Sequence, residues 1–315
     1  MNLPHLHLLL NHVPTVGYAV GVGLLIVALF SKDEPLHRMS LRIIFLVALL
    51  SIPVYLTGVA AGQIMQGREG VSAVWLRIHE NAALLALLLM ELTGAAAWLA
   101  LWQFRRFGRP LRATVASVVL LAVVSFLLMG RVAYIGGGIR HPEVLAIEET
   151  VLPGVPATET AWLTTAAVKA VALNTTWAWP ASETVHFIGL ALSFGVILVL
   201  NLRVLGLMKS VAFADLHRMM PWGMLGFAAN FLSGMMFFIA IPESYDLNIA
   251  FHWKMAMLVL TGVNLLYFTS AEDAWHLGSG VDATITAKAM AASTIFLWAG
   301  VVFFGRMLPY IGGSF

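Results

Sequence analysis

Eight long apolar stretches constrain this chain more than any other feature of its sequence. A helix needs about 20 apolar residues to cross the hydrocarbon core of a bilayer. Stretches of that kind lie at roughly residues 12–31, 41–63, 78–103, 111–132, 184–204, 219–241, 250–270 and 287–308. With 60% hydrophobic and only 11% charged residues, the composition does not suit a soluble protein. We therefore predict an all-α integral membrane protein with eight transmembrane helices, for which the lipid bilayer is the first partner.

The second half of the sequence repeats the spacing of the first. Six matched pairs carry the repeat: His12 and His186, Gly21 and Gly195, Arg42 and Arg218, Gly58 and Gly234, His79 and His252, and Arg131 and Arg306. The residue numbers within these pairs differ by 173 to 176. Each copy has four helices, an even number, so both copies enter the membrane in the same direction. The sequence predicts two parallel-repeat four-helix bundles, at residues 1–137 and 183–315.

A polar connection at residues 138–182 joins the two predicted bundles. Its second part mixes apolar and polar residues and contains Trp162, Trp177 and Trp179. Tryptophan is enriched at the membrane–water interface, so we predict an interfacial helix here. The loops on one side of the membrane hold eleven Lys and Arg residues and those on the other side seven. The positive-inside rule then places this connection and both termini outside, in the periplasm of a bacterial inner membrane.

The composition also excludes several classes of function. A net charge of +2 does not favour nucleic acid as a partner. The chain has no cysteine, which excludes disulfides, thiolate zinc sites, iron–sulfur clusters and covalently attached c-type haem. A redox cofactor in this chain therefore depends on histidine, methionine or carboxylate ligands.

Four of the ten histidines share one predicted depth in the membrane. His12, His79, His186 and His252 each fall in the first turn of a helix that runs from outside to inside. An ionisable side chain inside a spanning helix usually faces the bundle interior and has a partner. Two imidazoles that face each other across a helical bundle suit the iron of a six-coordinate b-type haem. We expect one haem b in each copy, ligated by His12 with His79 and by His186 with His252.

Small and cationic residues complete the two predicted haem sites. Glycines at matched positions leave room where a flat ring lies against helix backbone, and cations near the water interface suit the haem propionates. The glycines are Gly21, Gly58, Gly195 and Gly234, and the cations are Arg131, Arg306, Arg77 and Lys254. Taken singly, such glycines are more often packing devices and such arginines more often interfacial anchors.

Two features leave alternatives open. The N-terminal residues His5 and His7 precede His12 at short spacing, which suits a copper or zinc site or a different haem ligand. Glu91 lies twelve residues after His79, deep in the third predicted helix. It would relay protons, bind a quinone headgroup, or serve as a hydrogen-bonded structural carboxyl.

Three segments resemble known protein families. The segments HLHLLLNHVP and RIHENAAL in the first copy, and WPASETVHFIGLALSFGVILVLNLRVLG in the second, are similar to uncharacterised bacterial membrane families with a cytochrome-b-like helical unit. The resemblance covers most of both copies through short motifs. It implies haem b and electron transfer and names no substrate. Cytochromes of the b561 type place haems near both membrane faces, whereas both histidine pairs predicted here lie at one face.

The expected function is that of a dihaem membrane cytochrome. It would pass electrons between a quinol or a periplasmic redox protein and another acceptor, as an electron-transfer subunit more than as a stand-alone enzyme. One alternative is a transporter for copper or a small solute. A second is a non-redox subunit that anchors a periplasmic enzyme beside other membrane subunits. The sequence contains no nucleophile triad, phosphate-binding loop or paired-carboxylate site that would assign a reaction.

Overall fold

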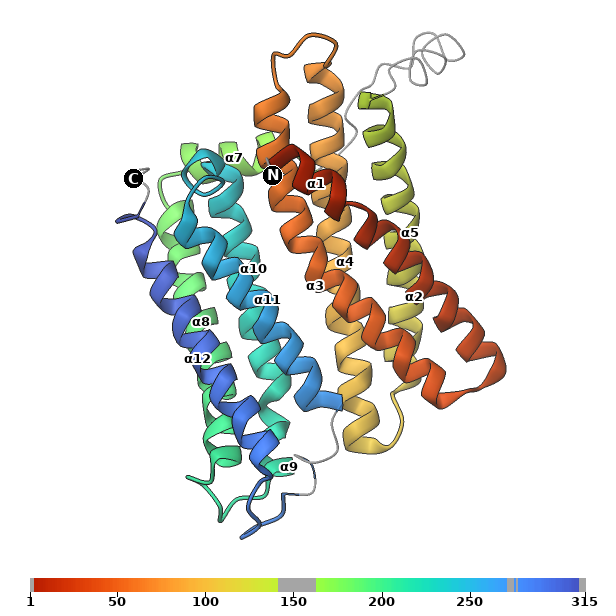
Figure 1. Ribbon diagram of the computed structural model, residues 1–315, viewed down its shortest axis with the longest axis vertical. Helices are drawn as coiled ribbons and strands as arrows, with labels where there is room; N and C mark the ends of the chain where they lie inside the picture. Colours follow the sequence, from red (N-terminus) through yellow and green to blue (C-terminus); the bar gives the residue numbers. More distant parts are fainter. Residues whose placement is uncertain (1–2, 141–162, 271–274, 276, 312–315) are drawn as a thin grey trace. The chain divides into compact units, whose positions relative to one another are not determined.

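A computed structural model describes residues 3–140, 163–270, 275 and 277–311 (Figure 1). Its secondary structure is helical throughout this described part of the chain, which contains no strand. Within these described residues, eight helical segments are long and apolar enough to cross a membrane. For this part of the chain, the prediction of an all-α protein with eight helices suited to crossing a membrane is confirmed. The chain divides into two compact units, one made of 1–100 and 111–168 and the other of 101–110 and 169–315.

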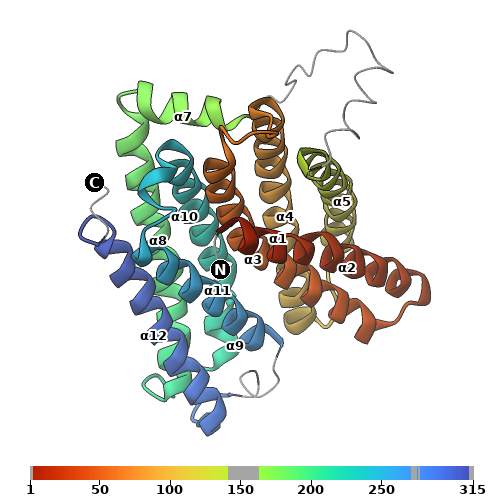
Figure 2. The same cartoon turned by 45° about the horizontal axis from the view of Figure 1, so that its top comes forward.

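The first unit contains four of the candidate membrane spans, and its first span is built from two helices that meet at Asn11 (Figure 2). The helices that begin in this unit are α1 (Leu3–Leu10), α2 (His12–Ser31), α3 (Glu34–Met65), α4 (Ala73–Phe107) and α5 (Arg112–Arg140). The last residues of α4, from Leu101 onward, belong to the second unit.

The second unit contains the other four spans together with short helical connections. Its elements are α8 (Ala178–Leu205), α9 (Phe213–Leu216), η1 (His217–Met219), α10 (Met220–Ala240), η2 (Pro242–Ser244), α11 (Ile249–Ser270) and α12 (Ile285–Met307). The short helix α7 (Thr165–Asn174) precedes them and lies in the part of the connection where we predicted an interfacial helix. Residues 141–162 of the predicted connection, which include Trp162, lie outside the described residues. Trp177 directly precedes α8, and Trp179 lies in its first turn.

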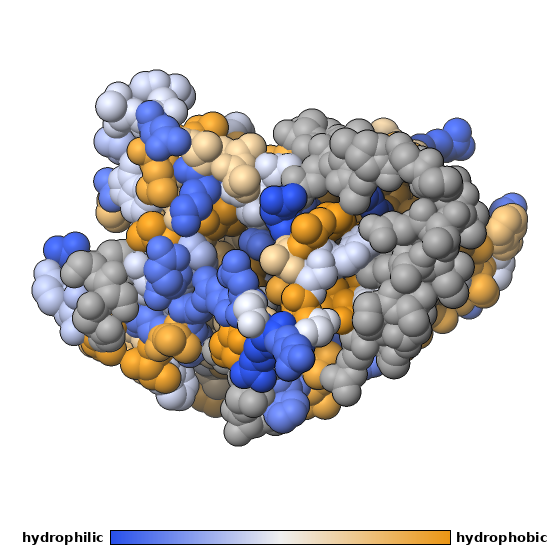
Figure 3. Space-filling view, turned by 90° about the horizontal axis from the view of Figure 1, so that it is seen from above, coloured by the Kyte–Doolittle hydropathy of each residue, from blue (hydrophilic) through white to orange (hydrophobic). Residues whose placement is uncertain are grey.

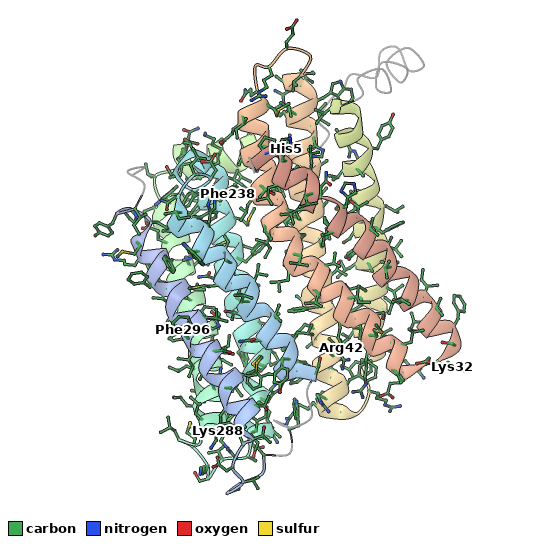
Figure 4. All side chains as sticks on the ribbon, viewed as in Figure 1. His5, Lys32, Arg42, Phe238, Lys288 and Phe296 are labelled. Carbon is green, nitrogen blue, oxygen red and sulfur yellow. The ribbon has the colours of Figure 1, made fainter. Side chains whose placement is uncertain are left out.

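Local chemistry explains why α2 and α3 form a tight hairpin. Lys32 ends α2 with a left-handed backbone conformation, at a φ of 56°. The side chain of Asp33 then caps α3 by accepting a hydrogen bond of 2.8 Å from the backbone nitrogen of Leu36. Pro35 lies in the first turn of α3, where a backbone N–H would have no partner within the helix, so proline fits there without losing a hydrogen bond. Lys32 is labelled at this turn in Figure 4.

Small residues allow close helix contacts inside each unit. In the first unit, a Cβ added at Gly94 on α4 would lie 2.6 Å from the Cβ of Ala48 on α3. In the second, a Cβ added at Gly189 on α8 would lie 2.6 Å from the carbonyl oxygen of Gly226 on α10. Glycine pairs of this kind bring helix backbones together in membranes, where dispersion contacts and hydrogen bonds drive association.

The outer surfaces of the helices are apolar, as lipid contact requires. Phe30 on α2 has 86% of its surface exposed, and Ile285 at the start of α12 has 82%. Large hydrophobic side chains are exposed on every long helix of both units. Figure 3, which looks down on the helix ends, shows hydrophilic residues gathered there among hydrophobic ones. This distribution suits a multi-pass membrane protein whose helix sides face hydrocarbon.

Candidate functional site

The imidazole of His7, on α1, lies against α3. Its Nδ1 is 3.1 Å from the carbonyl oxygen of Val54 and 3.5 Å from the hydroxyl of Thr57. A carbonyl oxygen only accepts hydrogen bonds, so Nδ1 carries the proton and Nε2 keeps its lone pair. A Cβ at Gly58 would lie 2.8 Å from Cε1 of His7. Glycine at this position therefore makes room for the ring.

His79, on α4, lies close to His7 and against α5. The two rings are near enough for a charge on one to act on the other. A Cβ at Gly136 would lie 2.9 Å from Cε1 of His79. One hydrogen bond joins the ring to the carbonyl of Val132, while the buried Nδ1 has no hydrogen-bond partner. In the first unit, two imidazoles thus lie near each other, and each ring packs against a glycine.

His12 does not take part in this arrangement. Its side chain is exposed, and its Nδ1 is 3.2 Å from the carbonyl oxygen of Leu8, one turn back in the chain. Because the helix is interrupted at Asn11, His7 and His12 lie on different helices. The structure therefore does not bring His12 to His79, and His7 is the residue that lies there. His5, labelled in Figure 4, is exposed on α1.

In the second unit, His186 on α8 occupies a setting that resembles that of His7. Its Nδ1 is 3.0 Å from the hydroxyl of Ser233 on α10. That hydroxyl donates its own proton to the carbonyl of Ala229 at 2.7 Å, so its oxygen accepts a hydrogen bond from the Nδ1–H of His186. A Cβ at Gly234 would lie 3.5 Å from Cε1 of His186, which is ordinary contact.

Lys254, and not His252, is the α11 residue that lies near His186. The lysine charge acts on the His186 ring, and a Cβ at Gly305 on α12 would lie 3.7 Å from the lysine Nζ. His252 is exposed, and its Nε2 donates to the carbonyl oxygen of Asp246 at 2.7 Å. The structure therefore does not bring His186 and His252 together.

Two titratable groups, Tyr245 and Asp246, lie in the segment between η2 and α11. Burial raises the pKa of Asp246, and one of its carboxylate oxygens, Oδ1, has no hydrogen-bond partner. Burial also raises the pKa of the neighbouring Tyr245 to about 12, and the charge of Glu183 adds to this effect. Both groups therefore favour their neutral forms more than the free side chains do.

The remaining predicted glycines differ in their surroundings. A Cβ at Gly21 would lie 3.0 Å from Cγ1 of Ile44, so this glycine allows α2 to pack on α3. No atom lies within 4 Å of a Cβ built at Gly195. Neither residue contacts a candidate histidine, whereas Gly58 and Gly234 both do.

The predicted cations also separate into two kinds. Arg77, Arg131 and Arg306 are exposed, as residues that anchor helix ends in headgroups would be. Lys254 is half-buried beside His186. The structure therefore places Lys254 next to a candidate histidine.

Glu91 lies within a polar contact between α3 and α4. Its Oε1 accepts a hydrogen bond of 3.1 Å from the hydroxyl of Ser51. The hydroxyls of Thr93 on α4 and Ser125 on α5 are also 3.1 Å apart. The Ser51 contact suits a hydrogen-bonded structural carboxyl, and this interpretation, the proton relay and the quinone site all stay predictions.

The sequence spacing favours His12 and His252 over His7 and Lys254. Helix geometry shows that two such neighbours cannot both face the bundle interior. Successive residues turn by roughly 100° about a helix axis, so residues two apart lie on nearly opposite faces. His252 and Lys254 are such a pair, and only one of them is able to face the bundle. For His7, the useful signal was the Thr57–Gly58 pair that matches Ser233–Gly234.

The described residues contain no group of three or more His, Cys, Asp or Glu side chains placed to hold a metal ion. No family model, curated protein or solved structure matches the chain.

Proposed function

We propose that this chain is a membrane b-type haem protein whose first unit holds one haem between His7 and His79. The haem would supply reversible one-electron transfer. The protein would exchange electrons with a quinol or an extramembrane redox partner on one side and another acceptor on the other. The positive-inside count supports a bacterial inner membrane location with α1 on the periplasmic side.

One observation carries this proposal: two imidazoles lie near enough for the charge of one to act on the other, and each has a ring nitrogen available to a ligand. The carbonyl of Val54 accepts a hydrogen bond from the Nδ1–H of His7, which leaves Nε2 with its lone pair. Metal-ligating histidines commonly donate their other ring N–H to a carbonyl in this way. The buried Nδ1 of His79 has no partner of its own. A side chain at Gly58 or at Gly136 would press on the edge of the adjoining ring, so glycine at each position leaves space for the imidazole.

The number of ligands favours haem over a simple metal ion. Structural zinc sites use four protein ligands and catalytic zinc sites three. Haem iron already has four porphyrin nitrogens, so two imidazoles complete its coordination. Because the described residues hold no cluster of three ligating side chains, the pair at His7 and His79 suits haem better than copper or zinc.

The second unit supports a different stoichiometry from the two haems expected from sequence. His186 has Lys254 beside it in place of a second imidazole, and His252 is exposed. A lysine ammonium repels a metal cation unless it loses its proton. We therefore propose one haem per chain, in the first unit.

The test is a pyridine-haemochrome assay with absorption and EPR spectra on detergent-purified protein expressed with added haem precursor. We expect one haem b per chain with a low-spin, six-coordinate spectrum. His7→Ala and His79→Ala should each remove the haem or convert it to a five-coordinate, high-spin form. The matched controls His12→Ala and His252→Ala should keep the wild-type spectrum.

Two outcomes would count against the proposal. A folded, colourless wild-type protein would exclude haem altogether. Loss of haem in His12→Ala with retention in His7→Ala would return the site to the pair chosen from sequence. The variant His186→Ala tests the stoichiometry. Loss of half the haem in that variant would show that the second unit also holds a haem, against the proposal of one haem per chain.

A further inference from the structure

His217 is a fully buried histidine that the proposed haem site does not use. It lies in η1, the single turn between α9 and α10, and only 1% of its surface is exposed. Its ring packs against Trp275, with ring centroids 4.3 Å apart, and against Phe213 at 5.5 Å. Its backbone carbonyl accepts a hydrogen bond of 3.2 Å from the indole nitrogen of Trp102. Neither ring nitrogen has a hydrogen-bond partner.

The ring borders a small cavity inside the second unit. Its volume is about 30 Å³, and residues of α8, α9, η1, α10, α11 and α12 line it. Asn201 on α8 lies in this lining and donates its amide N–H to the carbonyl of Ile197 at 2.7 Å. The other end of that amide, Oδ1, is buried without a partner. Three unpaired polar atoms therefore belong to two residues that line one cavity.

The other polar groups of the lining do not satisfy these atoms. The hydroxyl of Thr261 donates to the carbonyl of Met257, and that of Thr294 donates to the carbonyl of Met290, each at 2.8 Å. The rest of the lining consists of aliphatic, aromatic and methionine side chains. A buried donor or acceptor without a partner is costly, and native proteins usually pair such groups with protein or with ordered water.

The chemistry of the unpaired atoms specifies the ligand. A neutral imidazole offers one N–H donor and one lone pair, and the Asn201 carbonyl offers a second acceptor. The ligand must therefore donate and accept hydrogen bonds. The charges of Arg105 and Arg106 act on His217, which disfavours a bound cation. A cavity of about 30 Å³ has room for roughly one or two water molecules.

We infer that this cavity is an internal water site, in which one or two water molecules bridge His217 and Asn201. One water molecule bridges Asn201 Oδ1, to which it donates, and one ring nitrogen of His217; a second water pairs with the other ring nitrogen, because the two nitrogens point to different sides of the ring. The site gives the second unit a hydrated, proton-exchanging histidine within a candidate membrane span. It rests on none of the residues proposed to hold haem.

Water-edited solid-state NMR on ¹⁵N-histidine-labelled protein in lipid bilayers tests this site. Magnetisation transferred from water should reach the His217 ring nitrogens about as fast as those of the exposed His12, although His217 is buried. The His217 signals are assigned by their loss in His217→Gln. A transfer as slow as that to the buried indole of Trp298, labelled in the same sample, would overturn the inference.

Two substitutions on α8 provide a matched comparison. Asn201→Leu removes the carbonyl acceptor and fills the space, so transfer from water to His217 should slow severalfold. Ser193→Ala, a buried residue on the same helix that does not line the cavity, should leave the transfer rate unchanged. An unchanged rate in folded Asn201→Leu would exclude the bridge. If that variant fails to fold, the wild-type rate alone decides between a hydrated and a dry cavity.

Discussion

His186 Nδ1 lies 3.0 Å from the hydroxyl of Ser233, and the glycine that follows this serine lies in contact with the histidine ring. The first unit contains the same combination, in which His7 lies 3.5 Å from the hydroxyl of Thr57 and against Gly58. A histidine seated on a hydroxyl–glycine pair therefore occurs in both units. The pair is matched by sequence, whereas the histidine that occupies it in the first unit is not the one that sequence spacing selected.

The contact between Gly58 and His7 predicts a sharp effect of one methyl group. In Gly58→Ala the new Cβ would lie 2.8 Å from the imidazole, so the ring must move. Overpacking of this kind costs about 1–3 kcal/mol, against a gain of about 0.5–1 kcal/mol from placing alanine in a helix. Haem content and unfolding temperature should both fall.

Gly62→Ala is the matched control for this substitution. Gly62 lies one turn further along α3, and no atom lies within 4 Å of its added Cβ. The variant should keep the wild-type haem content and be as stable as wild type or slightly more so. Equal haem contents in Gly58→Ala and Gly62→Ala would show that the position of the His7 ring does not matter for binding.

The crossing of α8 and α10 predicts intolerance of side chains at Gly226. A Cβ there would lie 2.8 Å from the carbonyl oxygen of Gly189 and 2.9 Å from the backbone nitrogen of Ser193. Backbone atoms do not yield as a flexible side chain does, so Gly226→Ala should destabilise the second unit by about 1–3 kcal/mol. Thermal unfolding in detergent measures the effect. Gly195→Ala, which meets no atom within 4 Å, should be near neutral.

The hydrogen bonds of Arg203, at the end of α8, predict that lysine cannot replace arginine at this position. This fully buried side chain donates to the carbonyls of Val211, Gly278 and Val281, and so joins two loops. The single ammonium of lysine does not reproduce this planar fork. Arg203→Lys should therefore cost roughly 1–3 kcal/mol for each carbonyl left unpaired.

The exposed Arg218 supplies the comparison for Arg203. It forms one surface ion pair with Asp215, at 3.3 Å. Arg218→Lys should change the free energy of unfolding by less than about 0.5 kcal/mol. Similar losses of stability in Arg203→Lys and Arg218→Lys would contradict the structural role assigned to Arg203.

The ion pairs of Asp282 predict a dependence of stability on acid. Lys288, at 2.9 Å, and then Lys209, at 3.0 Å, hold the pKa of Asp282 at about 2, below its ordinary value of 3.8. Because the folded-state pKa is lowered, the stabilisation is fully present above about pH 4 and is lost as the pH falls towards 2. Lys288 is labelled near the start of α12 in Figure 4.

Unfolding temperatures measured from pH 5 to pH 2 test this dependence. Asp282→Asn should be less stable than wild type at pH 5, and the difference between them should shrink as the pH falls to 2. Asp215→Asn, which removes a carboxylate from a single exposed ion pair, controls for the loss of one negative charge. A difference that stays constant over this range would exclude Asp282 as the titrating group.

Much of the architecture was predictable because membrane insertion depends on local composition. The eight predicted spans correspond to eight long apolar helices. Their ends were less predictable: α3 extends from Glu34 to Met65, beyond the predicted 41–63, because Asp33 caps it in the polar region outside the apolar stretch. Where the first or last turn of a helix is charged or polar, a hydropathy profile does not detect that turn. It detects only the apolar part of each helix, which crosses the hydrocarbon.

The candidate site was only partly predictable, because ligand geometry depends on the direction of each side chain. His79, His186, Gly58 and Gly234 were singled out from sequence, and the structure places a histidine against a glycine in both units. His12 was preferred to His7 because its spacing to Gly21 matches that of His186 to Gly195. The bend at Asn11 makes that spacing a poor guide to where the side chains lie.

The sequence by itself determined that this chain is helical, apolar and suited to eight membrane crossings, because those properties follow from runs of neighbouring residues. Only the tertiary structure decided which histidines lie near each other. Residues five apart on a continuous helix, as His7 and His12 would be, differ by roughly 140° around its axis, and a bend between them changes that relation again. Which side chains face the interior of a bundle is therefore set by how helices bend and pack, and not by the residue types along them.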